Sequence, residues 1–169
     1  MALFFVLSLL EIFKYMEAKE IINKLGLVPH PEGGYYKRTF CSAKQSIDCK
    51  YVMSSIYYLL EKEDFSAFHR LSSVEVWFFH IGEPINIYIL NKEGKLETHS
   101  LSSQISDNFQ LAIEPNTWFA VEIPSKKGFS LVSCAVAPEF SFNNFELANK
   151  EELIKEYPQY QSIINRLTR

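Results

Sequence analysis

Short apolar runs alternate with turn-forming segments from residue 34 to residue 137. The clearest two-residue period lies in residues 85–91 (INIYILN), whose three isoleucines fall on one face of a strand. β-branched and aromatic residues dominate the other runs, and Gly, Pro and Asn separate them. We expect strands at residues 34–40, 52–60, 75–80, 85–91, 95–101, 117–123 and 129–136. Closely spaced strands without intervening helices predict an all-β sandwich or barrel.

Helical periodicity is confined to the two ends of the chain. A helix is expected to begin near Met16 and to end at Gly26, because the intervening residues place apolar side chains on one side only. Two further helical runs, at residues 150–157 and 159–167, are separated by Pro158, which fits at the start of a helix but not inside one. The predicted fold class is therefore all-β with short N- and C-terminal helices.

The beginning of the chain, MALFFVLSLL, is unusually apolar. It is too short to span a bilayer and lacks the positive charge that begins a signal peptide. We interpret residues 1–15 as an N-terminal apolar extension and residues 16–169 as a single domain. The apolar surface of the extension and the edge strands of the barrel need cover, which predicts a homodimer.

Composition and charge exclude several classes of partner. The 169 residues include 17 basic and 20 acidic side chains, and the net charge of -3 is not concentrated in any segment, so neither nucleic acid nor a membrane is expected as a partner. Three cysteines without a CxxC pattern argue against a disulfide framework and a zinc ribbon, and favour a reducing, cytoplasmic setting. No GxSxG, HExxH, Walker-type or GxGxxG motif occurs. The expected partner is a small polar metabolite, for example a sugar or a sugar nucleotide.

Ionisable residues interrupt the strongly apolar segment 65–84. His69 and Glu75 can be metal ligands, an acid and a base lining a small-molecule pocket, or ordinary polar residues where a strand reaches solvent. Because side chains alternate along a strand, His69 shares a face with Leu71, and Glu75 shares a face with Trp77. If the two serines between them form a turn, both faces can line one cavity. An imidazole and a carboxyl group that face each other there would have pKa values near neutrality, as proton transfer requires.

Aromatic side chains are the expected walls of this pocket. Strand parity favours Tyr57 and Trp77, while Tyr36 and Phe119 add rings that can pack against a sugar or a planar ligand. Arg38 can bind a phosphate or a carboxylate, or it can pair with an acidic residue on the surface.

Other polar residues nearby are interpreted as structural. His30 lies between two prolines. Glu32-Gly33-Gly34 is expected either to turn the chain into the barrel, which we prefer, or to let a ligand approach the backbone. Arg70 has the opposite parity to His69 and is expected to point outward. Cys134 alternates with valines, so we expect a buried thiol that packs as a small apolar group and is not a nucleophile.

Four separated blocks of sequence resemble the fifth family of the cupin superfamily. They are residues 30–36 (HPEGGYY), 55–60 (SIYYLL), 69–77 (HRLSSVEVW) and 136–148, with VAPEF at its start and FELA at its end. The spacing His69-x-Leu71-xxx-Glu75-xxxxxx-Gly82 is similar to the first cupin motif, and residues 114–119 (EPNTWF) are similar to the second. The similarity runs from about Ile21 to Pro158. It implies a double-stranded β-helix barrel, usually a dimer, similar in shape to sugar-nucleotide epimerases of the dTDP-rhamnose pathway, and it brings no established reaction.

Departures from the cupin motifs decide the expected chemistry. The resemblance implies a metal site of three histidines and one glutamate, but it places the second and third histidines at Leu71 and Phe119. Only His69 and Glu75 remain, so we expect no tightly held metal ion and no cofactor. Asn116 stands where the second motif has glycine, which indicates a positive φ.

Three hypotheses about function follow, in order of preference. The first is a metal-independent isomerase or epimerase in which His69 and Glu75 exchange a proton with a small polar metabolite. The second is a non-catalytic module that binds such a metabolite unchanged. The third is a metal-dependent cupin enzyme whose remaining ligands come from elsewhere in the chain. A purely structural role for the two residues stays open beside all three.

Overall fold

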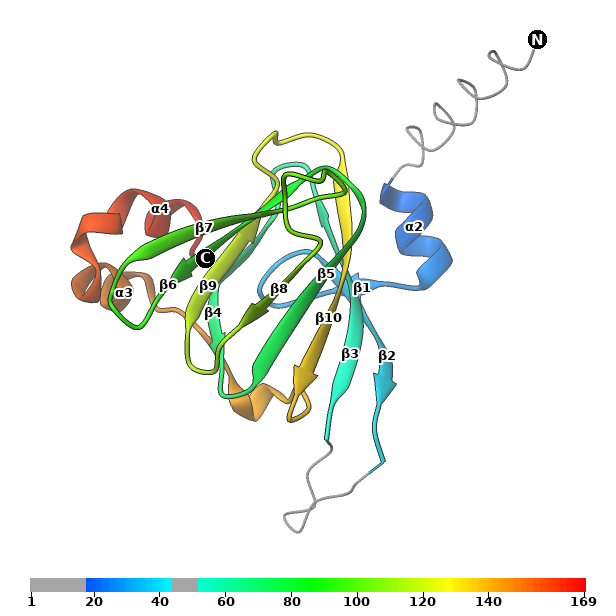
Figure 1. Ribbon diagram of the computed structural model, residues 1–169, viewed down its shortest axis with the longest axis horizontal. Coiled ribbons are helices and arrows are strands. Elements are labelled where there is room, and N and C mark those ends of the chain that lie inside the picture. The colour runs from blue at the N-terminus through cyan, green and yellow to red at the C-terminus, as the bar shows by residue number, and fades with distance from the viewer. Residues whose placement is uncertain (1–17, 44–51) are drawn as a thin grey trace.

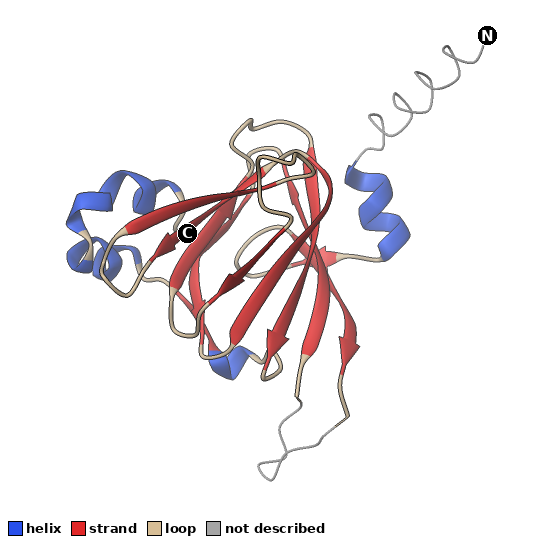
Figure 2. Ribbon diagram, in the orientation of Figure 1, coloured by secondary structure: helices blue, strands red, loops and turns tan. Residues whose placement is uncertain are grey.

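The computed structural model of the protein describes residues 18–43 and 52–169. Within these residues, eleven strands form two antiparallel sheets that pack face to face, with short helices near both ends of the described chain (Figures 1 and 2). This arrangement confirms the predicted all-β barrel with terminal helices. The expected apolar extension, residues 1–15, lies outside the described residues.

Each sheet combines strands from distant parts of the chain. The six-stranded sheet has the order β1 (Val28–Pro29), β2 (Tyr35–Cys41), β3 (Ser54–Glu61), β10 (Phe129–Ala137), β5 (Val74–Gly82) and β8 (Gln110–Ile113). The five-stranded sheet has the order β11 (Phe145–Leu147), β4 (Phe65–Leu71), β9 (Trp118–Glu122), β6 (Ile85–Leu90) and β7 (Leu96–Leu101). Strands β4 and β5 are consecutive but belong to different sheets, so the chain crosses between the sheets at the two serines that separate them. This crossing lets the inward faces of both strands line the same interior.

The main hydrophobic core fills the space between the sheets. Ile85, Ile87 and Ile89 of β6 are all at most 8% exposed there, as their two-residue period predicts. Trp77 of β5 and Phe119 of β9 meet edge to face, with ring centroids 6.1 Å apart. Burying one side chain of this size contributes about 1.5–3 kcal/mol. The core therefore holds the two sheets, and the polar side chains that project between them, in fixed positions.

The N-terminal helix α2 (Ala18–Leu25) packs on the outer face of the six-stranded sheet. Its Ile21 is 3% exposed and belongs to one cluster with Leu59 of β3. The helix ends at Gly26, whose φ of 64° is left-handed, as the sequence predicts for a helix stop.

The C-terminal helices lie at the opposite end of the molecule from α2 (Figure 1). They are α3 (Lys150–Glu156) and α4 (Gln161–Arg166), joined by the 3-10 segment η2 (Pro158–Tyr160), which begins at the predicted proline. Leu153 and Ile164 pack against Phe68 of β4, so this pair covers the outer face of the five-stranded sheet. Another 3-10 segment, η1 (Phe142–Asn144), precedes β11. None of the helices among the described residues is long and apolar enough to cross a membrane.

Asn116 lies in the turn before β9 and has a φ of 59°. Its backbone N–H donates a hydrogen bond to Leu71 O at 2.6 Å. The positive φ expected at this glycine-like position is confirmed, and the hydrogen bond ties the turn to the end of β4.

Candidate functional site

A cavity opens between the two sheets and encloses about 490 Å³ of empty space, counted out to its open mouth. Its walls come mainly from β2, β3, β4, β5 and β10 and from the loop that precedes β2. Its lining residues are His30, Glu32, Tyr36, Arg38, Ser54, Ser55, Ile56, Tyr58, His69, Leu71, Glu75, Trp77, Cys134, Val136 and Phe140.

The loop at residues 30–34 enters the barrel because its glycines permit a very close approach to β4. Gly33 has a φ of 117°, and a Cβ atom there would lie 2.0 Å from Phe65 O. Tyr58 donates its hydroxyl hydrogen to Gly33 O at 2.7 Å, and Gly34 N donates to Asp64 Oδ2 at 2.7 Å. Only glycine satisfies these constraints at position 33 without a shift of the backbone. The turn expected from the sequence thus also delivers the neighbouring Glu32 to the interior.

Glu32 is the central polar residue of the cavity, although it is only 5% exposed. Its Oε1 accepts a hydrogen bond from Ser66 Oγ at 2.8 Å. Its Oε2 lies 3.4 Å from His69 Nε2 and 3.5 Å from His30 Nδ1. Glu32 N donates to His30 Nδ1 at 3.3 Å. One carboxylate therefore stands between two imidazoles inside the barrel.

His69 is held in one orientation. Its Nδ1 lies 2.7 Å from Ala67 O, and since a carbonyl can only accept, Nδ1 carries the hydrogen. Its ring packs on Phe119, with centroids 4.1 Å apart, and the residue is 2% exposed. Nε2 is then the atom that can take up or release a proton, and it faces Glu32.

Glu75 is an acid in an unfavourable environment for charge. Its pKa is raised from 4.5 to about 8, first by burial and second by the negative charge of Glu32, while the neighbouring Cys134 thiol and Trp77 indole act in the opposite direction. Within the described residues, Glu75 Oε2 and Trp77 Nε1 lack a hydrogen-bond partner of good geometry. At neutral pH the side chain is therefore mostly a protonated carboxylic acid, able to donate a hydrogen.

His30 closes the cavity beside an aromatic rim. Burial lowers its pKa, the negative charge of Glu32 opposes this effect, and His69 adds to it. Its ring packs edge to face on Tyr36 at 4.7 Å and nearly parallel to Phe142 at 6.2 Å. Because Phe142 is 55% exposed, this rim meets solvent.

Five of the predicted site residues line the cavity: His69, Glu75, Trp77, Tyr36 and Arg38. Their roles stay predictions. We expected His69 and Glu75 to face each other as a pair. In the structure the carboxylate beside His69 Nε2 belongs instead to Glu32.

Two predicted wall residues lie outside the lining. Phe119 supports the His69 ring from the core instead of facing the cavity. Tyr57 belongs to the cluster under α2 on the outer face, and the neighbouring Tyr58 takes the inner position. Tyr58 pairs with Val132, a core residue, whereas Tyr57 pairs with Ser133. Alternation along a strand shows which residues share a face, but not which face is inward. Choosing between Tyr57 and Tyr58 therefore required the pairing register of β3 with β10.

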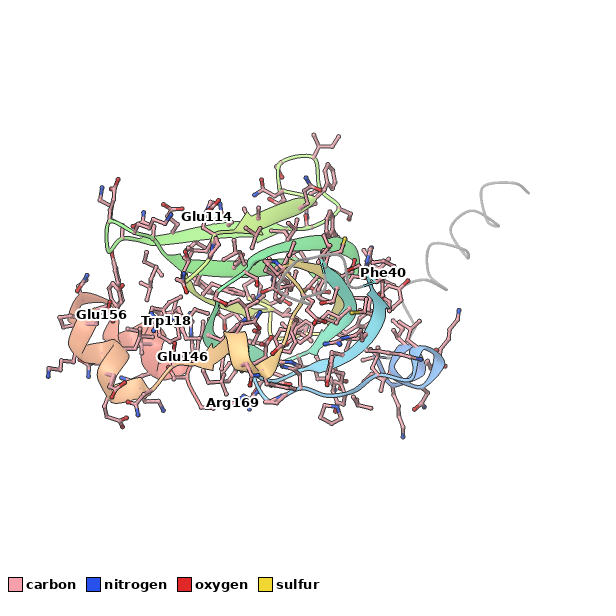
Figure 3. The ribbon with its side chains drawn as sticks, turned by 90° about the horizontal axis from the view of Figure 1, so that it is seen from below. Phe40, Glu114, Trp118, Glu146, Glu156 and Arg169 are labelled. Carbon is pink, nitrogen blue, oxygen red and sulfur yellow. The ribbon has the colours of Figure 1, made fainter. Side chains whose placement is uncertain are left out.

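Sequence reasoning also missed His30 and Glu32 as members of the cavity, since it interpreted His30 as structural and assigned Glu32 to a turn. Arg70 does point outward, as expected: Nε donates to Glu146 Oε2 at 2.7 Å, and the guanidinium lies 4.3 Å from the centre of the Trp118 ring. Figure 3 shows Trp118 and Glu146 near each other on the side of the C-terminal helices.

The donor set does not fit the metal centre that the family resemblance implies. Leu71 and Phe119, at the positions of the second and third histidines, have carbon-only side chains and are 4% and 1% exposed. Across residues 18–43 and 52–169, no three His, Cys, Asp or Glu side chains are arranged to hold a metal ion. The chemistry below therefore uses only the chain's own groups.

Comparisons with known proteins agree with this architecture. Residues 19–148 match the family model Cupin_5, described as cupin superfamily (DUF985). A protein from Shewanella oneidensis of known crystal structure is 35% identical, with a TM-score of 0.86 over 91% of this chain and 98% of that one. A hypothetical protein from Leishmania major is 28% identical, with a TM-score of 0.83 over 90% and 98%.

More distant structures share only the fold. Oxalate decarboxylase from Bacillus subtilis is 12% identical, with a TM-score of 0.55 over 82% of this chain and 36% of that one. A search of curated proteins finds no match.

Proposed function

Because the chain belongs to the Cupin_5 family of the cupin superfamily, a fold that serves many reactions, we propose from the cavity itself that the protein transfers protons to and from a small polar metabolite, as an isomerase or epimerase does. The observation that carries the proposal is the buried Glu75, whose Oε2 lacks a hydrogen bond of good geometry and whose pKa is raised to about 8, in the same cavity as the His69 and Glu32 pair. One group is ready to give a proton, and the other can receive one.

His69 is the proposed base. Neutral imidazole offers a lone pair at Nε2, because Nδ1 holds its hydrogen against Ala67 O. When Nε2 takes a proton from a carbon next to a carbonyl group, the Glu32 carboxylate 3.4 Å away stabilises the imidazolium that forms. Ser66 keeps that carboxylate in place.

Glu75 is the proposed acid. Its proton passes to the carbonyl oxygen of the substrate while the electrons of the broken C–H bond form the C=C bond of an enol. Protonation of the same carbon on the opposite face, with return of the enol proton to Glu75, gives the epimer; protonation of the former carbonyl carbon, with loss of the hydroxyl hydrogen of its neighbour to Glu75, gives the isomer. A carboxylic acid with a pKa of about 8 is suited to this step near neutral pH. A sugar or the sugar part of a sugar nucleotide has the required carbonyl and hydroxyl groups, and the aromatic and polar lining of the cavity suits such a ligand.

Hydrogen exchange tests the proposal without knowledge of the product. Ketoses, aldoses and their nucleoside diphosphate derivatives are incubated in deuterated water with the protein, and proton NMR follows the loss of carbon-bound hydrogen. We expect exchange with at least one compound, reduced by about 10²-fold or more in His69→Gln and in Glu75→Gln. Arg70→Gln, on the outer surface, serves as the matched control and should retain the rate.

Two results would count against the proposal. Exchange that persists in both variants would place the chemistry elsewhere. A metabolite that binds in the cavity and never exchanges hydrogen would identify a binding protein without catalysis.

A further inference from the structure

The inner part of the cavity contains two polar atoms that a ligand can satisfy. Glu75 Oε2 and Trp77 Nε1 are buried without a hydrogen bond of good geometry in the described part of the chain, although the Trp77 indole and the Cys134 thiol lie close enough to Glu75 to lower its pKa, and residues Glu75 and Trp77 are 6% and 1% exposed. Buried polar atoms in folded proteins nearly always have a partner. The indole N–H can only donate, and the protonated carboxyl group can donate or accept. A ligand hydroxyl or carbonyl group matches both.

The mouth of the cavity contains an arginine without an acidic partner. Among the described residues, Arg70, Arg166 and Arg169 each form an ion pair with a carboxylate. Arg38, the fourth arginine of the sequence, forms none in that part of the structure. Its Nη2 donates to Phe140 O at 3.1 Å, and the other guanidinium donors are available.

Two acidic residues on segments that approach Arg38 contact other groups. Glu139, on the segment beside Phe140, accepts a hydrogen bond from Cys41 Sγ at 3.3 Å. Glu32, which also lines the cavity, is engaged with Ser66 and the two imidazoles. A guanidinium binds carboxylate and phosphate oxygens through two parallel hydrogen bonds, so its position at the mouth favours an anion there.

We propose that the substrate is a hydroxy or keto compound with a carboxylate or phosphate group, which Arg38 binds at the mouth while the hydroxyl or carbonyl group meets Glu75 and Trp77. The inference rests on the proposed function for the identity of the site, and it narrows the substrate class from polar metabolites to anions. Carboxylate and phosphate can each accept two parallel hydrogen bonds from a guanidinium, so the probes must separate them.

Binding of matched probe pairs tests the inference. Lactate is compared with neutral lactamide, and glycerol 3-phosphate with neutral glycerol, in titrations followed by the indole N–H signals in ¹H–¹⁵N NMR spectra. The protein has two tryptophans, and Trp77→Phe identifies the signal of interest. We expect at least one anion to shift the Trp77 signal and to bind about tenfold or more tightly than its neutral partner.

Variants test whether the preference for anionic over neutral probes comes from the Arg38 side chain. Arg38→Gln should reduce the affinity of the anion about tenfold and leave the neutral probe unchanged. Lys37→Gln is the matched control, because Lys37 lies on the same strand with its amino group on Leu25 O, away from the cavity, and this variant should bind as the wild type does. Both variants should retain the wild-type spectrum without probe, which shows that they fold.

The outcomes separate this inference from the proposed function. Equal binding of anions to wild type and Arg38→Gln, or no binding of either anion, would overturn the anionic substrate class. Anion binding through Arg38 in a protein that exchanges no hydrogen would uphold the inference and overturn the catalytic proposal. Hydrogen exchange with neutral compounds at a rate unaffected by Arg38→Gln would uphold the catalytic proposal and overturn the anionic substrate class.

Discussion

Replacing Glu75 by glutamine should change how the stability of the protein depends on pH. Folding raises the pKa of this carboxyl group from 4.5 to about 8. Below pH 4.5 both states are protonated and there is no penalty. Between these values the unfolded chain has released its proton while the folded protein keeps it, so the free energy of unfolding falls as pH rises. Above about 8 both states are ionised and the penalty stays constant.

The magnitude follows from the interval between the two pKa values. Each pH unit within it removes about 1.4 kcal/mol from the free energy of unfolding, and the whole interval removes about 5 kcal/mol. Glutamine has nearly the same shape and does not titrate. Other ionisable groups contribute equally to both proteins, so the difference between wild type and Glu75→Gln isolates this one carboxyl group.

Urea denaturation at about pH 5.5 and at about pH 7.5 measures the effect. Relative to Glu75→Gln, the wild type should lose about 3 kcal/mol between the two conditions. Any difference in how the folded protein accommodates the amide and the acid is the same at both pH values and cancels. Parallel pH dependence in the two proteins would refute the reasoning, because it would mean that Glu75 ionises equally in the folded and unfolded states.

Three further predictions concern the loop and the donor set. Gly33→Ala should destabilise the protein by at least about 2 kcal/mol in chemical denaturation, because the new Cβ would lie 2.0 Å from Phe65 O. The control Gly94→Ala, whose Cβ would have no neighbour nearer than 3.8 Å, should cost about 1 kcal/mol. Equal losses of stability in the two variants would contradict the close approach of Gly33 to β4. Arg169→Ala removes the donor that lies 3.1 Å from Glu32 O and should cost about 1 kcal/mol, measured in the same way; an unchanged stability would show that this contact does not hold the loop. Elemental analysis of protein purified without chelators should find well below one transition metal ion per chain, and a stoichiometric ion would show that the donor set was misjudged.

The sequence predicted the strands best where one face is fully buried. The isoleucines of β6 alternate without interruption, and all three lie in the core. Strand β8 at the sheet edge was missed, because the alternation of exposed and inward residues in QLAI spans only four residues. Strand β11 was missed because three residues are too few to show a period.

The site was predictable only as far as single strands could define it. His69, Glu75 and Trp77 were found because β4 and β5 each carry one inward face into the cavity. The choice of Tyr57 over Tyr58 failed because the register between strands is set by tertiary pairing.

Glu32 reaches His69 through a loop, and loops have no periodicity from which to predict a partner. The signal that was available is the acidic residue between His30 and two glycines, since paired glycines allow a backbone to pass close to a neighbouring strand. Interpreting the segment as a turn was correct for the backbone and incomplete for the side chain.

The most direct test of the central claim is a ¹³C NMR titration of the Glu75 side-chain carboxyl carbon, assigned with Glu75→Gln. A protonated acid that shares its cavity with the Glu32 carboxylate should titrate near pH 8, and the midpoint should fall in Glu32→Gln, because the negative charge of Glu32 contributes to the raised pKa. A midpoint near 4.5 in the wild type, or one that does not respond to the loss of Glu32, would contradict the account.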